Sequence, residues 1–336
     1  MKKASLKDIA KLAGVSTSTV SFVLNGKADI MRISKPIAEK VAAIAKKSGY
    51  HPNQLAVSLR TGQSKIIGLL LEDISNNFFA TLAKFIEDEA NDCGYKVVYC
   101  STENDSEKAK SLIQMLSHQQ VDGFIIVPTD NIDKDIQQLI DYRRPVVLMD
   151  RFLPSINTPY VLVNNFEGIK TGTIHLIEKG YRKIGFVTVD LDMIQMQKRE
   201  EAYMQTIHGH SKSIKRSFLL KLPYKESPTA SIKKIRSFIR ESSLDAIFFA
   251  TNYLGLLGLE SIKQSKLKIP TDLAVICFDD HDIFRLHTPE ITAIRQPIKE
   301  IAKTAVQILL AQMENKKRPG KTQVEILPQL ILRAST

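Results

Sequence analysis

The chain has 336 residues, of which 43% are hydrophobic and 25% charged; these values are typical of soluble globular proteins, and the length predicts two or three domains. Its three cysteines lack CxxC spacing, which argues against a disulfide framework or a zinc site. No apolar run approaches the ~18 residues of a membrane span, and no hydrophobic signal segment follows the N-terminal lysines. We therefore expect a cytoplasmic protein with no membrane partner.

The net charge of +11 is concentrated near the N-terminus. Residues 1–62 hold nine Lys and two Arg against Asp8, Asp29 and Glu39, a balance of +8, so that the rest of the chain carries only +3. A basic segment on a nearly neutral body suits contact with nucleic-acid phosphates, because binding releases their counterions. A solvated lysine-rich surface is the alternative.

Residues 5–25, SLKDIAKLAGVSTSTVSFVLN, predict two short helices joined by a tight turn. Apolar residues at helical spacing, with Ser5 and Asp8 placed as a capping box, predict the first helix, which Gly14 ends. Ser16 is the expected N-cap of the second helix. Such a pair is a helix-turn-helix, whose second helix lies in the major groove of DNA.

The run KDIAKLAGVSTSTVSFVLN resembles the N-termini of the LacI/GalR bacterial transcription regulators, and the resemblance extends over essentially the whole chain. It implies that two headpieces of a homodimer read a pseudo-palindromic operator in double-stranded DNA. The expected DNA contacts are Ser16, Thr17, Ser18, Thr19, Ser21 and Phe22. We expect Thr17 and Ser18 to reach base edges and the other hydroxyls to contact phosphates. Phe22 either presses on thymine methyl groups or packs against the third helix.

A third helix is predicted from Ser34 as its N-cap and Pro36 in its first turn, completing a DNA-binding domain over residues 1–52. The segment before it, GKADIMRI, is polar and irregular. The buried stripe of the third helix is expected to be Ile37, Val41, Ile44 and Ala45.

Residues 53–63, NQLAVSLRTGQ, form the next segment, which is too short for a stable free helix because helix nucleation is costly. The resemblance implies a hinge that becomes helical on operator DNA. There Leu59 would wedge into a minor-groove step, with Arg60 beside it in the groove. A plain linker is the alternative.

From residue 64 to residue 336, short apolar strands alternate with amphipathic helices, which predicts α/β lobes with parallel sheets covered on both faces. A first series of strands is expected at 65–71, 96–100, 123–127 and 145–149, and a second at 160–164, 183–189, 217–220, 245–250 and 273–278. The resemblance implies a two-lobed fold like that of the type I periplasmic binding proteins, which binds the effector and forms the dimer. The expected lobes are residues 64–160 with 296–320, and residues 161–295 with 321–336. The helix at 298–313 is thus assigned to the first lobe and the final strands to the second.

Polar and aromatic side chains just after the strands are the candidate effector site, because open α/β sheets bind ligands at the carboxyl ends of their strands. Sugar hydroxyls need paired charged or amide partners, and the C–H faces of a sugar ring pack on aromatic rings. Arg199 is expected to open a helix of the second lobe. The set is similar in location to the pocket of the ribose-binding periplasmic proteins: Asn76, Phe78, Phe79, Asp150, Arg151, Arg199, Asn252, Asp279 and Gln296.

Each of these residues also has a simpler interpretation. Phe79 could be a core residue behind the cleft, and an Asp at the end of a strand often caps the helix that follows. Asn164 lies in VLVNN, where relatives often carry Asp, and is left out of the site.

Enzymatic and metal sites find little support in the sequence. Asp279–Asp282 (DDHD) and His208–His210 (HGH) contain metal-ligand residue types, but consecutive loop residues rarely converge on one ion. No GxGxxG, Walker A or GxSxG motif occurs. We expect neither a cofactor nor a metal, and no catalytic residue.

These features predict a sequence-specific homodimeric regulator, a repressor of carbohydrate-utilisation genes, controlled by a sugar or sugar phosphate between the lobes. The ligand would change the lobe angle and shift operator affinity by a coupling of about 1–3 kcal/mol. Inducer and corepressor action both fit, and a dimer is expected over a tetramer because no leucine-heptad tail is present. The alternatives are a sugar-binding receptor without a DNA role and an enzyme built on the same sheets.

Overall fold

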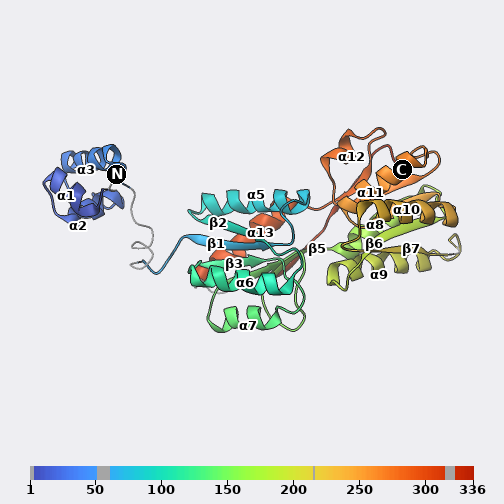
Figure 1. Ribbon diagram of the computed structural model, residues 1–336, viewed down its shortest axis with the longest axis horizontal. Coiled ribbons are helices and arrows are strands. Elements are labelled where there is room, and N and C mark those ends of the chain that lie inside the picture. Colours follow the sequence, from blue (N-terminus) through green and yellow to red (C-terminus); the bar gives the residue numbers. More distant parts are fainter. Residues whose placement is uncertain (1–3, 51–60, 215, 315–321) are drawn as a thin grey trace. The chain divides into compact units, whose positions relative to one another are not determined.

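The computed structural model describes residues 4–50, 61–214, 216–314 and 322–336 and divides the chain into two compact units, Met1–Ser64 and Lys65–Thr336 (Figure 1). The predicted hinge contacts Leu59 and Arg60 lie outside the described residues. Within the described residues, no helix has the length and apolar character needed to cross a membrane.

The first unit is a three-helix headpiece made of α1 (Leu6–Ala13), α2 (Thr17–Leu24) and α3 (Lys35–Lys47). The predicted caps are present. Ser5 and Asp8 form a reciprocal capping box, Gly14 ends α1 in a left-handed conformation (φ 71°), and the Ser16 side chain accepts a hydrogen bond from the backbone of α2. Ser34 occupies the N-cap position of α3, but its side chain makes no capping hydrogen bond. The helix-turn-helix prediction is therefore confirmed.

The headpiece core is small and lies where the three helices meet. Its fully buried members are Ile9, Ala10, Ala13, Val20, Val41 and Ala45. Ile37 was predicted to share this core, but its side chain is 38% exposed. It lies in the first turn of α3, whereas the core forms around Val41 and Ala45, further along the helix.

The second unit contains two lobes, each built on a six-stranded sheet. In the first sheet the order is β11-β5-β4-β3-β1-β2, with all pairs parallel. Its strands are β1 (Ile66–Leu71), β2 (Lys96–Ser101), β3 (Gly123–Ile126), β4 (Val146–Met149), β5 (Tyr160–Val163) and β11 (Gln323–Ile326). The helices α5 (Asn77–Asp92) and α13 (Ile298–Met313) cover one face, and α6 (Ser106–His118) and α7 (Asp133–Asp141) cover the other (Figure 1).

The second sheet has the order β12-β10-β9-β8-β6-β7 and is parallel except for the β10–β12 pair. Its strands are β6 (Ile184–Asp190), β7 (Phe218–Pro223), β8 (Ala246–Phe249), β9 (Ala274–Phe278), β10 (Thr292–Arg295) and β12 (Gln329–Ile331). The helices α8 (Asn165–Glu178) and α9 (Ile194–Gly209) cover one face, and α10 (Pro228–Ser242) and α11 (Asn252–Gln264) the other, with the short α12 (Asp282–Leu286) after β9. The predicted two-lobed α/β fold is confirmed.

The lobe assignment of two strands was wrong. The sequence pattern placed residues 160–164 and the final strands in the second lobe, but β5 pairs with β4 and β11 in the first sheet. Only β12 joins the second sheet, through β10. An apolar strand pattern shows that a strand is buried without showing which sheet it extends, so the error lies in pairing and not in strand prediction. The helix α13 packs on α5, β3, β4 and β5 of the first lobe.

Close helix packing in the second lobe gives a stability test. A Cβ added at Gly258 of α11 would lie 2.0 Å from Cζ of Phe249, a fully buried ring of β8. We expect Gly258→Ala to lower the free energy of unfolding by about 1–3 kcal/mol, because a packed ring has nowhere to move. Gly209→Ala, whose added Cβ meets nothing within 4 Å, is the matched control and should change stability by less than about 0.5 kcal/mol. Equal denaturation midpoints for the two variants would contradict this packing.

Candidate functional site

The exposed start of α2 is the candidate DNA-reading surface of the headpiece. Thr17 and Ser18 are exposed, and neither hydroxyl has a hydrogen-bond partner among the described residues. The hydroxyl of Ser16, in contrast, accepts from the Thr19 backbone at 3.1 Å and lies 2.9 Å from the Thr19 hydroxyl. Ser16 and Thr19 thus have a structural role at the start of the helix. The hydroxyls of Thr17 and Ser18, in contrast, are available to a ligand.

Further along α2, Ser21 and Phe22 are half-buried. The Ser21 hydroxyl receives a hydrogen bond from the Asn25 side chain at 3.2 Å, which ties it to the end of the helix. Phe22 is not part of the headpiece core formed by the described residues. Its half-buried ring therefore lies outside the cluster formed by the three helices.

In the second unit, a cavity of about 50 Å³ lies between the carboxyl ends of the two sheets. Eight of the nine predicted effector residues line it: Asn76, Phe78, Phe79, Asp150, Arg199, Asn252, Asp279 and Gln296. Arg151 is the ninth. It is 4% exposed and stands behind the wall, where it contacts two carboxylates, Glu72 and Asp150.

The two cavity aspartates occupy corresponding positions in the two lobes. Asp150 directly follows β4 and Asp279 directly follows β9, and each of these strands is fourth along the chain in its lobe. Both residues adopt the left-handed backbone conformation, with φ of 66° and 67°. This conformation is uncommon for non-glycine residues and tends to mark functional sites. Neither Asp caps the helix that follows it, so the capping interpretation does not hold.

Arg199 is the most deeply buried charge of the site, at 2% exposure. Its guanidinium donates to the Asn165 side chain at 2.7 Å and to the Ala250 carbonyl at 2.6 Å, and it lies 3.7 Å from an Asp279 oxygen. It also stacks over the Phe278 ring at 3.7 Å from the centroid. Desolvation lowers the pKa of Arg199, and the charge of Asp279 opposes that effect.

Asp279 is in turn held by Gln296, whose amide donates to it at 2.5 Å. Burial raises the pKa of Asp279, and Arg199 and Gln296 act in the opposite direction. Asp150 shows the same pattern: burial raises its pKa, and the charges of Arg151 and Arg199 partly offset the effect. Both carboxyl groups are thus buried beside arginine side chains that favour their charged form.

The two phenylalanines serve both the core and the pocket. Phe78 and Phe79 are 8% and 5% exposed, their ring centroids are 5.0 Å apart in an edge-to-face arrangement, and both also line the cavity. Asn76, one residue before α5, holds this turn because its side chain accepts from the Phe78 backbone at 3.0 Å. It also accepts from the Asn252 side chain at 3.1 Å, which joins the lobes.

Sequence reasoning missed several cavity residues, of which Glu72, Met193, Gln195, Tyr224 and Tyr253 matter most. Glu72 directly follows β1, so the rule that selected the other strand-end residues would have selected it too. Met193 and Gln195 were missed because α9 was expected to begin at Arg199, and it begins at Ile194. Arg199 lies inside this helix rather than opening it.

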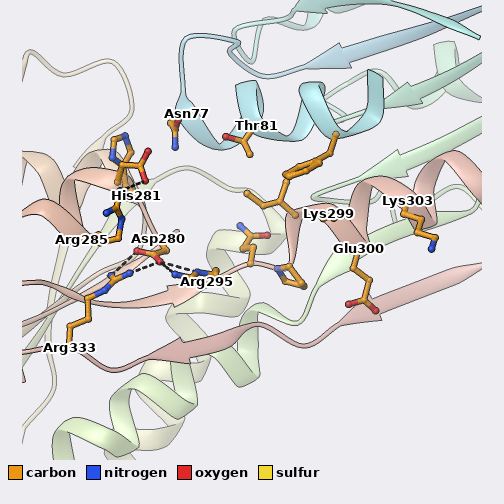
Figure 2. Close-up of a pocket in the computed structure, with 15 residues that line it drawn as sticks. Asn77, Thr81, Asp280, His281, Arg285, Arg295, Lys299, Glu300, Lys303 and Arg333 are labelled. Atoms are coloured by element: carbon orange, nitrogen blue, oxygen red, sulfur yellow. Dashed lines mark hydrogen bonds and ion pairs between the residues drawn. The ribbon is translucent and has the colours of Figure 1, made fainter. Parts of the chain in front are cut away.

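A second, larger cavity of about 700 Å³ shares Gln296 with the first. Figure 2 shows the residues that line this larger cavity. Asp280 lies at its wall and receives hydrogen bonds from Arg295 at 2.7 Å and Arg333 at 2.8 Å. Burial would raise the pKa of Asp280, but these hydrogen bonds outweigh burial and lower it. Neighbouring carboxylates thus have different surroundings: Asp279 lines the smaller cavity, and Asp280 is neutralised by two arginines.

The rest of the DDHD run also has separate partners. The His281 ring accepts from the Ile283 backbone at 3.1 Å, and Asp282 lies 3.5 Å from Arg285. In the part of the chain that the structure describes, no group of three or more His, Cys, Asp or Glu side chains is arranged to hold a metal ion.

Comparisons with known proteins match the whole chain. Three family models fit: bacterial regulatory proteins of the lacI family over residues 5–53, periplasmic binding proteins and sugar binding domain of LacI family over 64–230, and a periplasmic binding protein-like domain over 173–336. The ribose operon repressor of Haemophilus influenzae is 32% identical, and the HTH-type transcriptional repressor PurR of Aliivibrio fischeri is 30% identical, each over 99% of this chain and 98% of the relative.

The fold is similar to that of a lac repressor dimer bound to operator and the anti-inducer ONPF, with a TM-score of 0.87, 23% identity and 99% of both chains covered. The sequence identity to the two repressors extends over nearly the full length of the chain, and so covers both the headpiece and the two-lobed unit. The chain therefore belongs to the lacI family of bacterial regulatory proteins, transcriptional regulators that join a DNA-binding headpiece to an effector-binding domain.

Proposed function

We propose that this protein is a homodimeric repressor of carbohydrate-utilisation genes, controlled by a sugar bound between its lobes. One observation carries the effector proposal: eight of the nine side chains predicted from the sequence to bind a sugar line one cavity that both lobes share. Similarity to a ribose operon repressor supports the choice of a sugar. The DNA-binding residues are Thr17 and Ser18 at base edges, with Ser16, Thr19, Ser21 and Phe22 beside them.

In this proposal each predicted domain has its own role. Residues 1–52 bind the operator in the cytoplasm, residues 53–63 act as the hinge with Leu59 and Arg60 in the minor groove, and residues 64–336 bind the effector and dimerise. Closing or opening the lobes moves the paired hinges and changes operator affinity. We propose no catalytic activity, so sugars incubated with the protein should remain chemically unchanged.

Thr17→Ala and Ser18→Ala test the reading surface. Each should weaken binding to an operator selected from random duplexes by about 1 kcal/mol, roughly fivefold, because a hydrogen bond to a base edge is lost. Binding to non-specific duplex, measured in the same titration series, serves as the control and should not change, since phosphates supply that affinity. Unlike these two variants, Ser16→Ala should lower the free energy of unfolding by about 1 kcal/mol, because the N-cap of α2 is lost. An equal loss on both DNAs would rule out base reading by Thr17 and Ser18.

A thermal-shift screen with pentoses and hexoses tests the effector site. We expect at least one sugar to raise the melting temperature and to change operator affinity by a coupling of about 1–3 kcal/mol. Asp150→Asn should weaken the binding of that sugar at least tenfold, because it removes a charged acceptor. Asparagine tolerates the left-handed backbone conformation of this position, so the fold should be kept. Glu87→Asn, an exposed position on α5, is the control and should bind the sugar normally. Full sugar affinity in Asp150→Asn would place the ligand elsewhere.

The assembly state has a direct measurement. A protomer has a mass of 37.8 kDa, so light scattering of the full chain should give twice that value, since operator recognition requires two headpieces. A monomer that still binds a pseudo-palindromic duplex with one-to-one stoichiometry would contradict the dimer.

A further inference from the structure

The cavity between the lobes contains more acidic than basic groups, and the charge of its arginine is already offset. Three carboxylates, Glu72, Asp150 and Asp279, line the wall, whereas Arg199 is the one arginine among the described lining residues. Arg199 is paired with Asp279, and its remaining hydrogen bonds go to Asn165 and Ala250. An anionic ligand would therefore meet a cation whose charge Asp279 already offsets.

Arg151, behind the wall, is committed in the same way. Its guanidinium pairs with Glu72, contacts Asp150 at 3.4 Å and donates to the Asn104 side chain at 3.0 Å. A phosphoryl group could recruit Arg151 only by displacing Glu72 or by lying against that carboxylate. Either event is unfavourable, because like charges repel strongly in a desolvated site.

Glu72 connects the two lobes as well as neutralising Arg151. Its other oxygen accepts a hydrogen bond at 2.9 Å from the hydroxyl of Tyr224, which follows β7 in the second lobe. Burial and the charge of Glu72 both raise the pKa of Tyr224, so the phenol remains a donor. A dianion close to Glu72 would act against the contact that keeps the lobes together.

Two lining residues have a buried polar atom without a hydrogen-bond partner among the described residues, the Gln195 amide oxygen and the Tyr253 hydroxyl. Gln195 is 5% exposed, its Oε1 atom is buried, and that atom has no hydrogen-bond partner among the described residues. Its amide nitrogen points to Asp150 at 3.4 Å. A buried unpaired acceptor is costly, and a ligand hydroxyl can donate to it, whereas an ionised phosphate offers acceptors only.

We propose that the effector is an uncharged, hydroxyl-rich molecule of monosaccharide size, and that Glu72 is the residue that excludes phosphorylated sugars. This inference rests on the proposed sugar-responsive function and narrows it. The acidic wall and the unpaired acceptor both match a ligand that donates hydrogen bonds.

The test compares each sugar with its own phosphate ester, using calorimetry and thermal shift on the full-length protein in phosphate-free buffer. For every pentose or hexose that binds, we expect its phosphate to bind at least tenfold more weakly. A phosphate ester that binds as tightly as its parent sugar, or more tightly, would overturn the inference while leaving the sugar-responsive regulator intact. No binding by either class, in protein that still binds its operator, would overturn the sugar effector and this inference with it.

Variants separate charge from shape. Glu72→Gln keeps the size of the side chain but frees Arg151, so the affinity ratio of phosphate ester to parent sugar should rise at least fivefold. Tyr224→Phe loses the contact between the lobes but keeps the Glu72 charge, so this ratio should stay at its original value. Glu87→Gln, on the exposed face of α5, is the matched control and should also leave it unchanged. An unchanged ratio in Glu72→Gln, with the variant folded, would remove Glu72 from the specificity role.

Discussion

A buried guanidinium is the constraint on which the effector domain depends. Arg199 is 2% exposed, and a charge so far from water must be paired and hydrogen-bonded on every side. The structure meets this need with Asp279, the Asn165 side chain and the Ala250 carbonyl, which come from three separate segments of the second lobe. Pairing Arg199 therefore fixes the carboxyl edge of the second sheet, where the ligand cavity lies.

Paired charges and hydrogen bonds also connect the two lobes. Arg151 of the first lobe is paired with Glu72, and Glu72 accepts from Tyr224 of the second lobe. Asn252 donates to Asn76 across the same junction. These contacts join groups that also line or support the cavity. Under the function proposed above, a ligand in the cavity would change these contacts and with them the angle between the lobes, which is the physical basis for allosteric control.

The headpiece achieves its fold by a different means. Its core contains few side chains. Capping interactions at the helix ends therefore add stability that so small a core does not provide. The Ser5–Asp8 capping box, the left-handed Gly14 and the Ser16 cap fix the turn between α1 and α2. These local signals leave Thr17 and Ser18 exposed at the start of α2, with their hydroxyls available to DNA.

The sequence by itself determined the headpiece, the alternation of strands and helices, and eight of the residues that line the cavity, because capping and strand-end chemistry are local. It did not show that β5 and β11 extend the first sheet, since a buried strand has the same composition whichever sheet it joins. It also missed Gln195 and the role of Glu72, because the start of α9 and the pairing with Tyr224 depend on packing between lobes. Contacts between residues distant in the chain, and with them the charge balance of the cavity, were decided only by the tertiary structure.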